Sequence, residues 1–139
     1  MKKGFTIIEL MVTVAIIAIL AALIMVSFSN IKAKNRDAKR MGDLKSISNA
    51  LNLYYSVNNS FPTCLACPAG VYLNNNPIDA VSTKLKDGNF IPAPIIDPLN
   101  SGNYQYNYQS ANGTDYTLTF YLETNSIKGY SAGINTMKP

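Results

Sequence analysis

Lys2-Lys3-Gly4-Phe5-Thr6-Ile7-Ile8-Glu9-Leu10 opens the chain, and an uncharged run continues from Leu10 to Phe28. This run has 19 residues. At a rise of ~1.5 Å per residue, that is just enough to cross the hydrocarbon core of a bilayer. A single carboxylate, that of Glu9, stands at the mouth of the apolar helix. An ionisable side chain at that depth is costly, so Glu9 is a candidate functional residue.

This N-terminal segment resembles that of the type IV pilin-like family, which includes type IV pilins, competence pilins and the pseudopilins of type II secretion. The shared pattern is a basic leader ending in glycine, a Phe-Thr pair, a glutamate four residues after the phenylalanine, and an aliphatic run. The matching residues are Lys2, Lys3, Gly4, Phe5, Thr6, Ile8, Glu9, Leu10, Ala15, Ile16, Ile17, Ile19, Leu20, Ala21 and Ala22. The close match covers the first quarter of the chain, and beyond it the resemblance is one of architecture.

The resemblance implies a role for three residues. Gly4 would end a leader peptide, residues 1–4, that a membrane-embedded prepilin peptidase cuts from Phe5. The same peptidase would N-methylate Phe5, and Glu9 would pair with the Phe5 amine of a neighbouring subunit. The physics of a membrane agrees, because an ammonium and a carboxylate that both lose hydration are each other's best partners. Such a pair would set the axial register between subunits.

Two other interpretations of the segment remain open. One is a secretory signal peptide with a small-x-small cleavage site at Ser27-Phe28-Ser29, and the other is a plain membrane anchor. The apolar region is longer than the usual ~7–15 residues of a signal peptide. A secretory signal also rarely carries a carboxylate at the position of Glu9. We therefore favour the pilin-like interpretation.

Composition indicates one small domain on a helical anchor. The chain has 139 residues and a net charge of +4, from 12 basic and 8 acidic side chains. Loss of Lys2 and Lys3 would lower the charge to +2, which is too little to imply a nucleic-acid partner. Histidine is absent, and no Gly-rich phosphate loop or pair of carboxylates near a base is present. We expect a protein that is not an enzyme and needs no cofactor, with a membrane or filament-core half over 5–30 and a globular domain over 31–139.

The two cysteines lie close together in Cys64-Leu65-Ala66-Cys67-Pro68. A zinc site would need two more ligands, and the chain has no histidine and no further cysteine. A thioredoxin-like pair would need a βαβ unit, which is not visible in the pattern. A local disulfide between Cys64 and Cys67 needs only an oxidising compartment, and we favour it.

Calcium is the metal to consider from the resemblance, because major pseudopilins bind calcium in an Asp-rich C-terminal loop. This chain resembles them around Asp97-Pro98 and Tyr104-x-Tyr106. Its residues 123–139, however, contain only one acid, Glu123. Calcium takes six to eight oxygen ligands, usually with several carboxylates. We therefore predict no metal site, with Asp97 as the one residue that could contribute to a weak one.

The orientation in the membrane depends on two conflicting signals. Five basic residues follow the apolar run, namely Lys32, Lys34, Arg36, Lys39 and Arg40. A positive-inside count would therefore place the C-terminal domain in the cytoplasm. The resemblance and the cysteine pair both point outward. We expect a single pass through the cytoplasmic membrane with the domain outside. The charged band from Lys32 to Lys45 should be a solvated face near lipid head groups, from which Asp37 and Asp43 could reach adjacent subunits.

Phe5 to about Asn58 is predicted to form one helix, roughly 80 Å long at about 1.5 Å per residue. Its first half is apolar all round, which requires lipid or other helices around it. Its second half carries an apolar stripe at spacings of three and four: Met41, Leu44, Ile47, Leu51 and Tyr54. Many members of the resembled family have Gly and Pro where this chain has Ala18 and Val26. We therefore predict a more continuous helix here, also in a filament.

The rest of the chain is predicted to be a small domain that the stripe covers. The helix should stop at Asn58-Asn59-Ser60-Phe61-Pro62. A loop over 62–78 and a short helix from Asp79 to Lys86, ended by Gly88, should follow. Alternating side chains then predict three strands, near Tyr104 to Gln109, Tyr116 to Leu122 and Ile127 to Tyr130, with a turn at Ala111-Asn112-Gly113-Thr114 between the first two. The expected fold class is α+β, with the helix packed on a three-stranded antiparallel sheet, as in pilins.

The leading functional hypothesis is a structural subunit of a type IV pilus-like filament. Its partners would be other copies of the chain, the prepilin peptidase, an assembly platform in the cytoplasmic membrane, and lipid before assembly. One alternative is a pseudopilin of a type II secretion system, so the final location would be a cell-surface pilus or a periplasmic pseudopilus. Another is a competence pilin whose tip or flank holds DNA. The tyrosines could form an exposed surface for adhesion or for stacking on DNA bases, but we favour packing of the sheet as their role. Stronger basic clustering on the sheet domain would support DNA binding, and only four lysines are expected there: Lys84, Lys86, Lys128 and Lys138.

Overall fold

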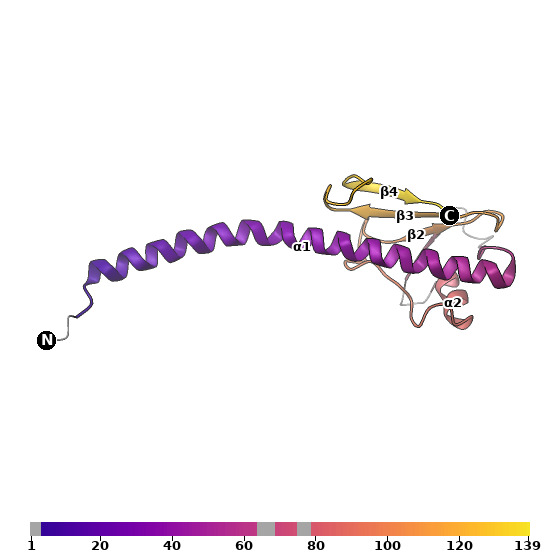
Figure 1. Ribbon diagram of the computed structural model, residues 1–139, viewed down its shortest axis with the longest axis horizontal. Coiled ribbons are helices and arrows are strands. Elements are labelled where there is room, and N and C mark those ends of the chain that lie inside the picture. The colour runs from indigo at the N-terminus through magenta and orange to yellow at the C-terminus, as the bar shows by residue number, and fades with distance from the viewer. Residues whose placement is uncertain (1–3, 64–68, 75–78) are drawn as a thin grey trace.

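The computed structural model describes residues 4–63, 69–74 and 79–139. One long helix, α1, forms a spine (Figure 1). A small antiparallel sheet lies on one side of its C-terminal half and a short helix, α2, on the other, while its N-terminal half projects alone. The expected α+β architecture is confirmed, including the protruding apolar half of the helix.

Helix α1 spans Ile7–Asn58, 52 residues, and is bounded by side-chain and backbone caps. It begins two residues later than predicted because Thr6 is extended and acts as its N-cap, while Phe5 precedes the helix. It ends where predicted, at Asn58, and is capped by Asn59, whose backbone is left-handed (φ 51°) and whose N–H donates to the Tyr55 carbonyl. The helix is continuous between Ala18 and Val26 in this single subunit. Its state in a filament remains a prediction.

The apolar stripe on the second half of α1 covers the domain, as predicted. Leu44, Ile47 and Leu51 are fully buried, and Met41 and Tyr54 are partly buried against the same core. The other core residues come from α2, the connecting segments and the sheet: Phe61, Leu73, Val81, Leu85, Ile91, Tyr106, Tyr108, Tyr116, Leu118, Phe120 and Leu122. Burying each large side chain stabilises the fold by about 1.5–3 kcal/mol before entropy is counted. The domain is thus held to α1 mainly by apolar packing.

The sheet has four strands rather than the predicted three. Their order is β1 (Val71–Tyr72), β2 (Asn107–Gln109), β3 (Thr117–Leu122) and β4 (Gly133–Met137), and every neighbouring pair is antiparallel. Strand β1 comes from the segment that we predicted to be loop. It is only two residues long and forms by pairing with β2, where Val71 lies opposite Tyr108. A two-residue strand leaves no periodic pattern in the sequence.

The third predicted strand was misplaced. Ile127 to Tyr130 is a turn, in which the Tyr130 N–H donates to the Ile127 carbonyl and Gly129 is left-handed (φ 88°). Ile127 and Tyr130 are apolar because they pack on the core, not because they alternate along a strand. The strand that pairs with β3 is β4, which lies a few residues later. Its apolar residue Ile134 is exposed, so apolar residues do not alternate along β4 in the way expected of a strand with one buried face.

Helix α2 spans Ala80–Asp87 and has the predicted boundaries to within a residue. The Asp79 carboxylate caps it by accepting hydrogen bonds from the N–H groups of Val81 and Ser82. Gly88 closes its C-terminal end. The helix contributes Val81 and Leu85 to the core on the side of α1 away from the sheet (Figure 1).

Candidate assembly site and its anchoring ion pairs

The predicted cleavage bond lies in extended chain just before α1. Gly4 and Phe5 precede the helix and are exposed, with 76% of Phe5 accessible to solvent. Backbone hydrogen bonds of the helix therefore do not enclose this bond. Such a position suits a processing site, and cleavage after Gly4 and methylation of Phe5 stay predictions.

Glu9 is joined to the residue that caps α1. The Thr6 N–H and hydroxyl both donate to Glu9 Oε2, at 2.9 and 2.8 Å, and the Glu9 N–H donates to Thr6 Oγ1 at 3.3 Å. This reciprocal arrangement is a capping box, which satisfies otherwise unpaired N–H groups at the start of a helix. The sequence analysis assigned Glu9 to assembly alone and missed this second role, although Thr-x-x-Glu is its known signature.

Phe5, just before the helix, and Glu9, in its first turn, line the same hollow. Together with Ile8, Val12 and Thr13 they line a shallow apolar hollow of about 290 Å³. The carboxylate that caps the helix therefore stands within an apolar surface next to the predicted new N-terminus. This arrangement suits a site in which an ammonium group from another chain completes the pairing of Glu9.

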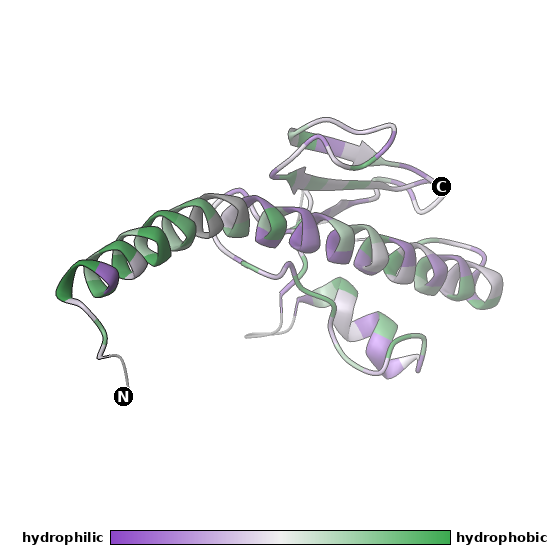
Figure 2. Ribbon diagram, turned by 60° about the vertical axis from the view of Figure 1, so that its left-hand side comes forward, coloured by the Kyte–Doolittle hydropathy of each residue, from purple (hydrophilic) through white to green (hydrophobic). Residues whose placement is uncertain are grey.

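The first half of α1 is apolar and uncovered. An 18-residue window of the helix reaches a mean hydropathy of 2.9, with no part of it buried by the rest of the chain. Figure 2 shows this hydrophobic half projecting away from a second half of mixed polarity. Its length and composition are those of a membrane span. A surface of this size and polarity needs lipid or other apolar helices around it.

A buried arginine ties α1 to the domain where the apolar half ends. Arg40 is fully buried and donates Nε and Nη2 to the two oxygens of Asp97, at 2.6 and 3.2 Å. Its Nη1 donates to Asp37 Oδ1 at 2.8 Å and to Glu123 Oε1 at 2.7 Å. The guanidinium carbon lies 4.9 Å from the ring centroid of Tyr104. The planar guanidinium of an arginine can bond several carboxylates at once in this way, whereas the ammonium of a lysine cannot.

The carboxylates around Arg40 are themselves held. Arg36 donates to both oxygens of Glu123, and Asp37 accepts hydrogen bonds from the N–H groups of Glu123 and Thr124 and from the Thr124 hydroxyl. We call these two arginines and three carboxylates, namely Arg36, Arg40, Asp37, Asp97 and Glu123, the ion cluster. It joins α1 to the segment after Ile95 and to the end of β3. Burial alone would lower the pKa of Arg40, but its hydrogen bonds to Asp97, Glu123 and Asp37 raise that pKa above its ordinary value.

The ion cluster overturns part of the predicted solvated band. Asp37 and Arg40 are fully buried, and Asp43 accepts a hydrogen bond from the Tyr106 hydroxyl at 3.0 Å. Asp37 and Asp43 thus bond within the subunit, and we withdraw the expectation that they reach adjacent subunits. Asp97, the residue considered for a weak calcium site, is bound to Arg40 and to the Leu99 N–H. Lys32, Lys34, Lys39 and Lys45 are exposed, as predicted.

Three tyrosines of the small domain are used for packing and are not available for stacking on DNA bases. Tyr106, Tyr108 and Tyr116 are buried against α1, and their hydroxyl groups bond to Asp43, Pro62 and Ser48 respectively. Cys64 and Cys67, predicted to form a disulfide, lie outside the residues that the structure describes. That pairing stays a prediction.

Acid is expected to weaken the ion cluster through Glu123. Hydrogen bonds from Arg36 and Arg40 lower the pKa of Glu123 from 4.5 to about 2, against the opposing effect of burial. A carboxylate with a depressed folded-state pKa contributes stability that is complete above its unfolded pKa and lost as the pH falls through its folded pKa. The melting temperature of the full chain in detergent should therefore fall between about pH 4.5 and about pH 2.

The matched control is Glu123→Gln, which removes this titration. It should melt at a lower temperature than the wild type near neutral pH and lose less stability across the acidic window. Burial raises the pKa of Asp43, so protonation of Asp43 in acid stabilises the folded state. This contribution is the same in the wild type and in the variant. Parallel melting curves for the two chains from neutral pH to about pH 2 would contradict the assignment.

Comparisons with known proteins show what the sequence is similar to. Residues 1–25 match a family described as the prokaryotic N-terminal methylation motif. The chain is 37% identical to type II secretion system core protein G of Aeromonas hydrophila over 99 residues, 70% of this chain and 67% of that protein. It is 30% identical to the protein of the same name from Vibrio cholerae serotype O1 over 114 residues, 81% of this chain and 75% of that protein.

A third similar protein, type II secretion system core protein G of Escherichia coli (strain K12), is 36% identical over 62 residues, 45% of this chain and 43% of that protein. The similarity to the Vibrio protein is too long to be confined to α1 and includes part of the small domain. No solved structure is significantly similar to the chain.

Proposed function

Because the chain belongs to the type IV pilin-like family, we propose that it is a pseudopilin, the structural subunit of a filament in a type II secretion system. The observation that carries this proposal is the 30% identity over 81% of the chain to a core protein G, which extends past the shared N-terminal motif. Type IV pilus subunit, our leading hypothesis from sequence, is a less specific description than pseudopilin. The pseudopilin alternative is preferred although no acidic residue follows Glu123.

The proposed maturation uses the extended residues before α1. A prepilin peptidase would hydrolyse the Gly4–Phe5 peptide bond and release residues 1–4 as a leader. The new amine of Phe5 would then be methylated. Before assembly, residues 5–30 would lie in the cytoplasmic membrane as a single pass, with the domain of residues 31–139 on the outer side.

The proposed assembly buries the apolar half of α1 among the same halves of other copies. Lipid covers this surface before assembly, so transfer between the two apolar environments gains little from the hydrophobic effect itself. Polar pairing can therefore decide the register. The Glu9 carboxylate would give up its hydrogen bonds to Thr6 and pair with the Phe5 ammonium of a neighbouring subunit. The ammonium carries a full positive charge, which the Thr6 groups lack.

The experiment that separates the two filament types is deletion of the gene in its own host. A pseudopilin predicts that exoproteins accumulate inside the cell envelope while surface pili remain, and that the wild-type gene restores their secretion. Loss of surface pili with normal secretion of exoproteins would identify a type IV pilus subunit and contradict the proposal. The variant Lys39→Ala, changed at an exposed site outside the ion cluster, should complement as well as the wild type.

A further inference from the structure

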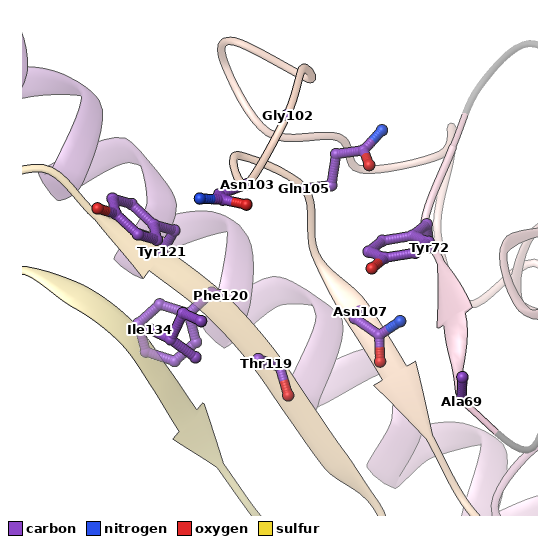
Figure 3. A pocket seen from close by; sticks show the side chains of 10 residues that line it. All are labelled: Ala69, Tyr72, Gly102, Asn103, Gln105, Asn107, Thr119, Phe120, Tyr121 and Ile134. Atoms are coloured by element: carbon purple, nitrogen blue, oxygen red, sulfur yellow. The ribbon is translucent and has the colours of Figure 1, made fainter.

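A polar groove crosses the face of the sheet that is turned away from α1. Its volume is about 240 Å³, and it is lined by Ala69, Tyr72, Gly102, Asn103, Gln105, Asn107, Thr119, Phe120, Tyr121 and Ile134. Figure 3 shows Tyr72 on β1 and Tyr121 on β3 at its two sides, with Asn103, Gln105, Asn107 and Thr119 between them. Neither the filament contacts proposed above nor the ion cluster uses this groove.

The groove offers hydrogen bonds without charge. No lysine, arginine, aspartate or glutamate is among its lining residues. The amide groups of Asn103, Gln105 and Asn107 make no hydrogen bond to any residue that the structure describes, and neither does the Thr119 hydroxyl. Each amide group carries two hydrogen-bond donors and an acceptor, and the threonine hydroxyl can both donate and accept. Three of these four residues, Gln105, Asn107 and Thr119, are half-buried, so a ligand here would find donors and acceptors that are partly withdrawn from water.

The two tyrosines add flat apolar surfaces at the sides. Tyr72 is 58% exposed. Tyr121 is held by an edge-to-face contact with Tyr104, whose ring centroid lies 4.9 Å away. Such rings present an apolar face together with a polar hydroxyl and lose little conformational freedom on binding. Ile134 on β4 extends the apolar part of the rim.

We propose that this groove binds a neutral saccharide of one or two rings. A sugar ring has hydroxyl groups that both donate and accept, which matches the free amides, and it has C–H faces that can lie on the tyrosine rings. The groove is smaller than the ~300–1,000 Å³ of pockets for drug-sized ligands, which fits a small ligand. Nucleic acid and other anions fit poorly, because the lining holds no cation to neutralise a phosphate. The proposal does not depend on whether the filament is a pilus or a pseudopilus.

The test is a titration of the ¹⁵N-labelled full chain in phosphocholine micelles, since a maltoside detergent would itself supply sugar. Maltose, cellobiose and N,N′-diacetylchitobiose are the probes. At least one should shift the side-chain amide signals of Asn103, Gln105 and Asn107 with a Kd of about 1 mM. The affinity should be unchanged between about 0.05 and about 0.5 M salt, because no charged pair forms.

Two variants and a matched control locate the site. Tyr72→Ala and Thr119→Ala should each weaken binding, the former by about tenfold. Thr117→Ala changes the same residue type on the same face of β3, outside the groove, and should leave binding intact. Three results would each overturn the proposal. One is no saturable shift with any probe, the second is equal affinity of all variants, and the third is shifts produced by an extended polar peptide but by none of the sugars.

Discussion

Replacing Glu9 by alanine is expected to leave the chain in the membrane and cleaved after Gly4, but to remove it from assembled filaments. The apolar run that directs insertion is unchanged, and the cleavage bond lies outside α1. Assembly, in contrast, would leave the Phe5 ammonium of the neighbour unpaired in an apolar environment. Breaking one partner of a buried ion pair costs about 3–5 kcal/mol, which lowers an association constant by two orders of magnitude or more.

Glu9→Gln separates the two roles of this side chain. A glutamine oxygen can still accept from the Thr6 N–H, so the capping box survives while the negative charge is lost. If charge pairing sets the register, the glutamine variant assembles as poorly as the alanine variant. Immunoblots of membrane and filament fractions measure the outcome, with the wild type and Lys39→Ala, changed at an exposed site far from this hollow, as controls. Normal filaments from Glu9→Gln would assign Glu9 to helix capping alone.

Arg40→Leu is expected to cause the largest loss of folding stability among single substitutions in the ion cluster. It would leave Asp37 and Asp97 as buried carboxylates without a cationic partner, while the bond between Arg36 and Glu123 would remain. The expected loss is about 3–5 kcal/mol. Since each kcal/mol shifts the melting temperature by about 4–8 °C in a domain of this size, the variant should melt at least 10 °C or so below the wild type.

The controls for this prediction lie on the same helix. Lys39→Ala removes an exposed charge next to Arg40 and should change stability by no more than about 0.5 kcal/mol. Arg40→Lys keeps the charge but cannot form the fork to Asp97 together with the bonds to Asp37 and Glu123, so it should fall in between. Circular dichroism melts of the full chains in detergent provide the measurement. If Arg40→Leu melts within a few degrees of the wild type, the ion cluster does not contribute the expected stability to the contact between α1 and the domain.

The ion cluster also links the domain to assembly. It sits where the exposed apolar half of α1 meets the buried stripe, and it fixes the helix to the segment after Ile95 and to the end of β3. A loose connection there would let the domain swing relative to the helix that packs in the filament. We therefore expect destabilised cluster variants to assemble less well even when their N-terminal motif is intact.

Local patterns were enough to predict α1, its C-terminal end, the stripe from Met41 to Tyr54, and α2. Each of these depends on residues that are close in sequence, such as the Asp79 cap or the spacing of Leu44, Ile47 and Leu51. Strand β1 was missed because it has two residues and pairs with a strand distant in sequence, and β4 was missed because its own residues do not alternate.

The burial of Asp37 and Arg40 had a signal that the sequence analysis did not use. These residues continue the spacing of the apolar stripe backwards, since 37, 40, 44, 47 and 51 are separated by three and four. Charged residues on a stripe that is otherwise buried predict partners from the domain, here Asp97 and Glu123. Which acids those partners are could not be predicted, because it depends on how the segment after Ile95 and the end of β3 fold back onto α1.

The N-terminal sequence and intact mass of the mature protein, purified from host membranes, test the account most directly. A pilin-like subunit predicts a chain that lacks residues 1–4 and begins at an N-methylated Phe5. A chain that begins near Asn30 would instead identify a secreted domain released by a signal peptidase. A chain that still carries Met1 would contradict processing and, with it, the proposed role of the Phe5 ammonium in assembly.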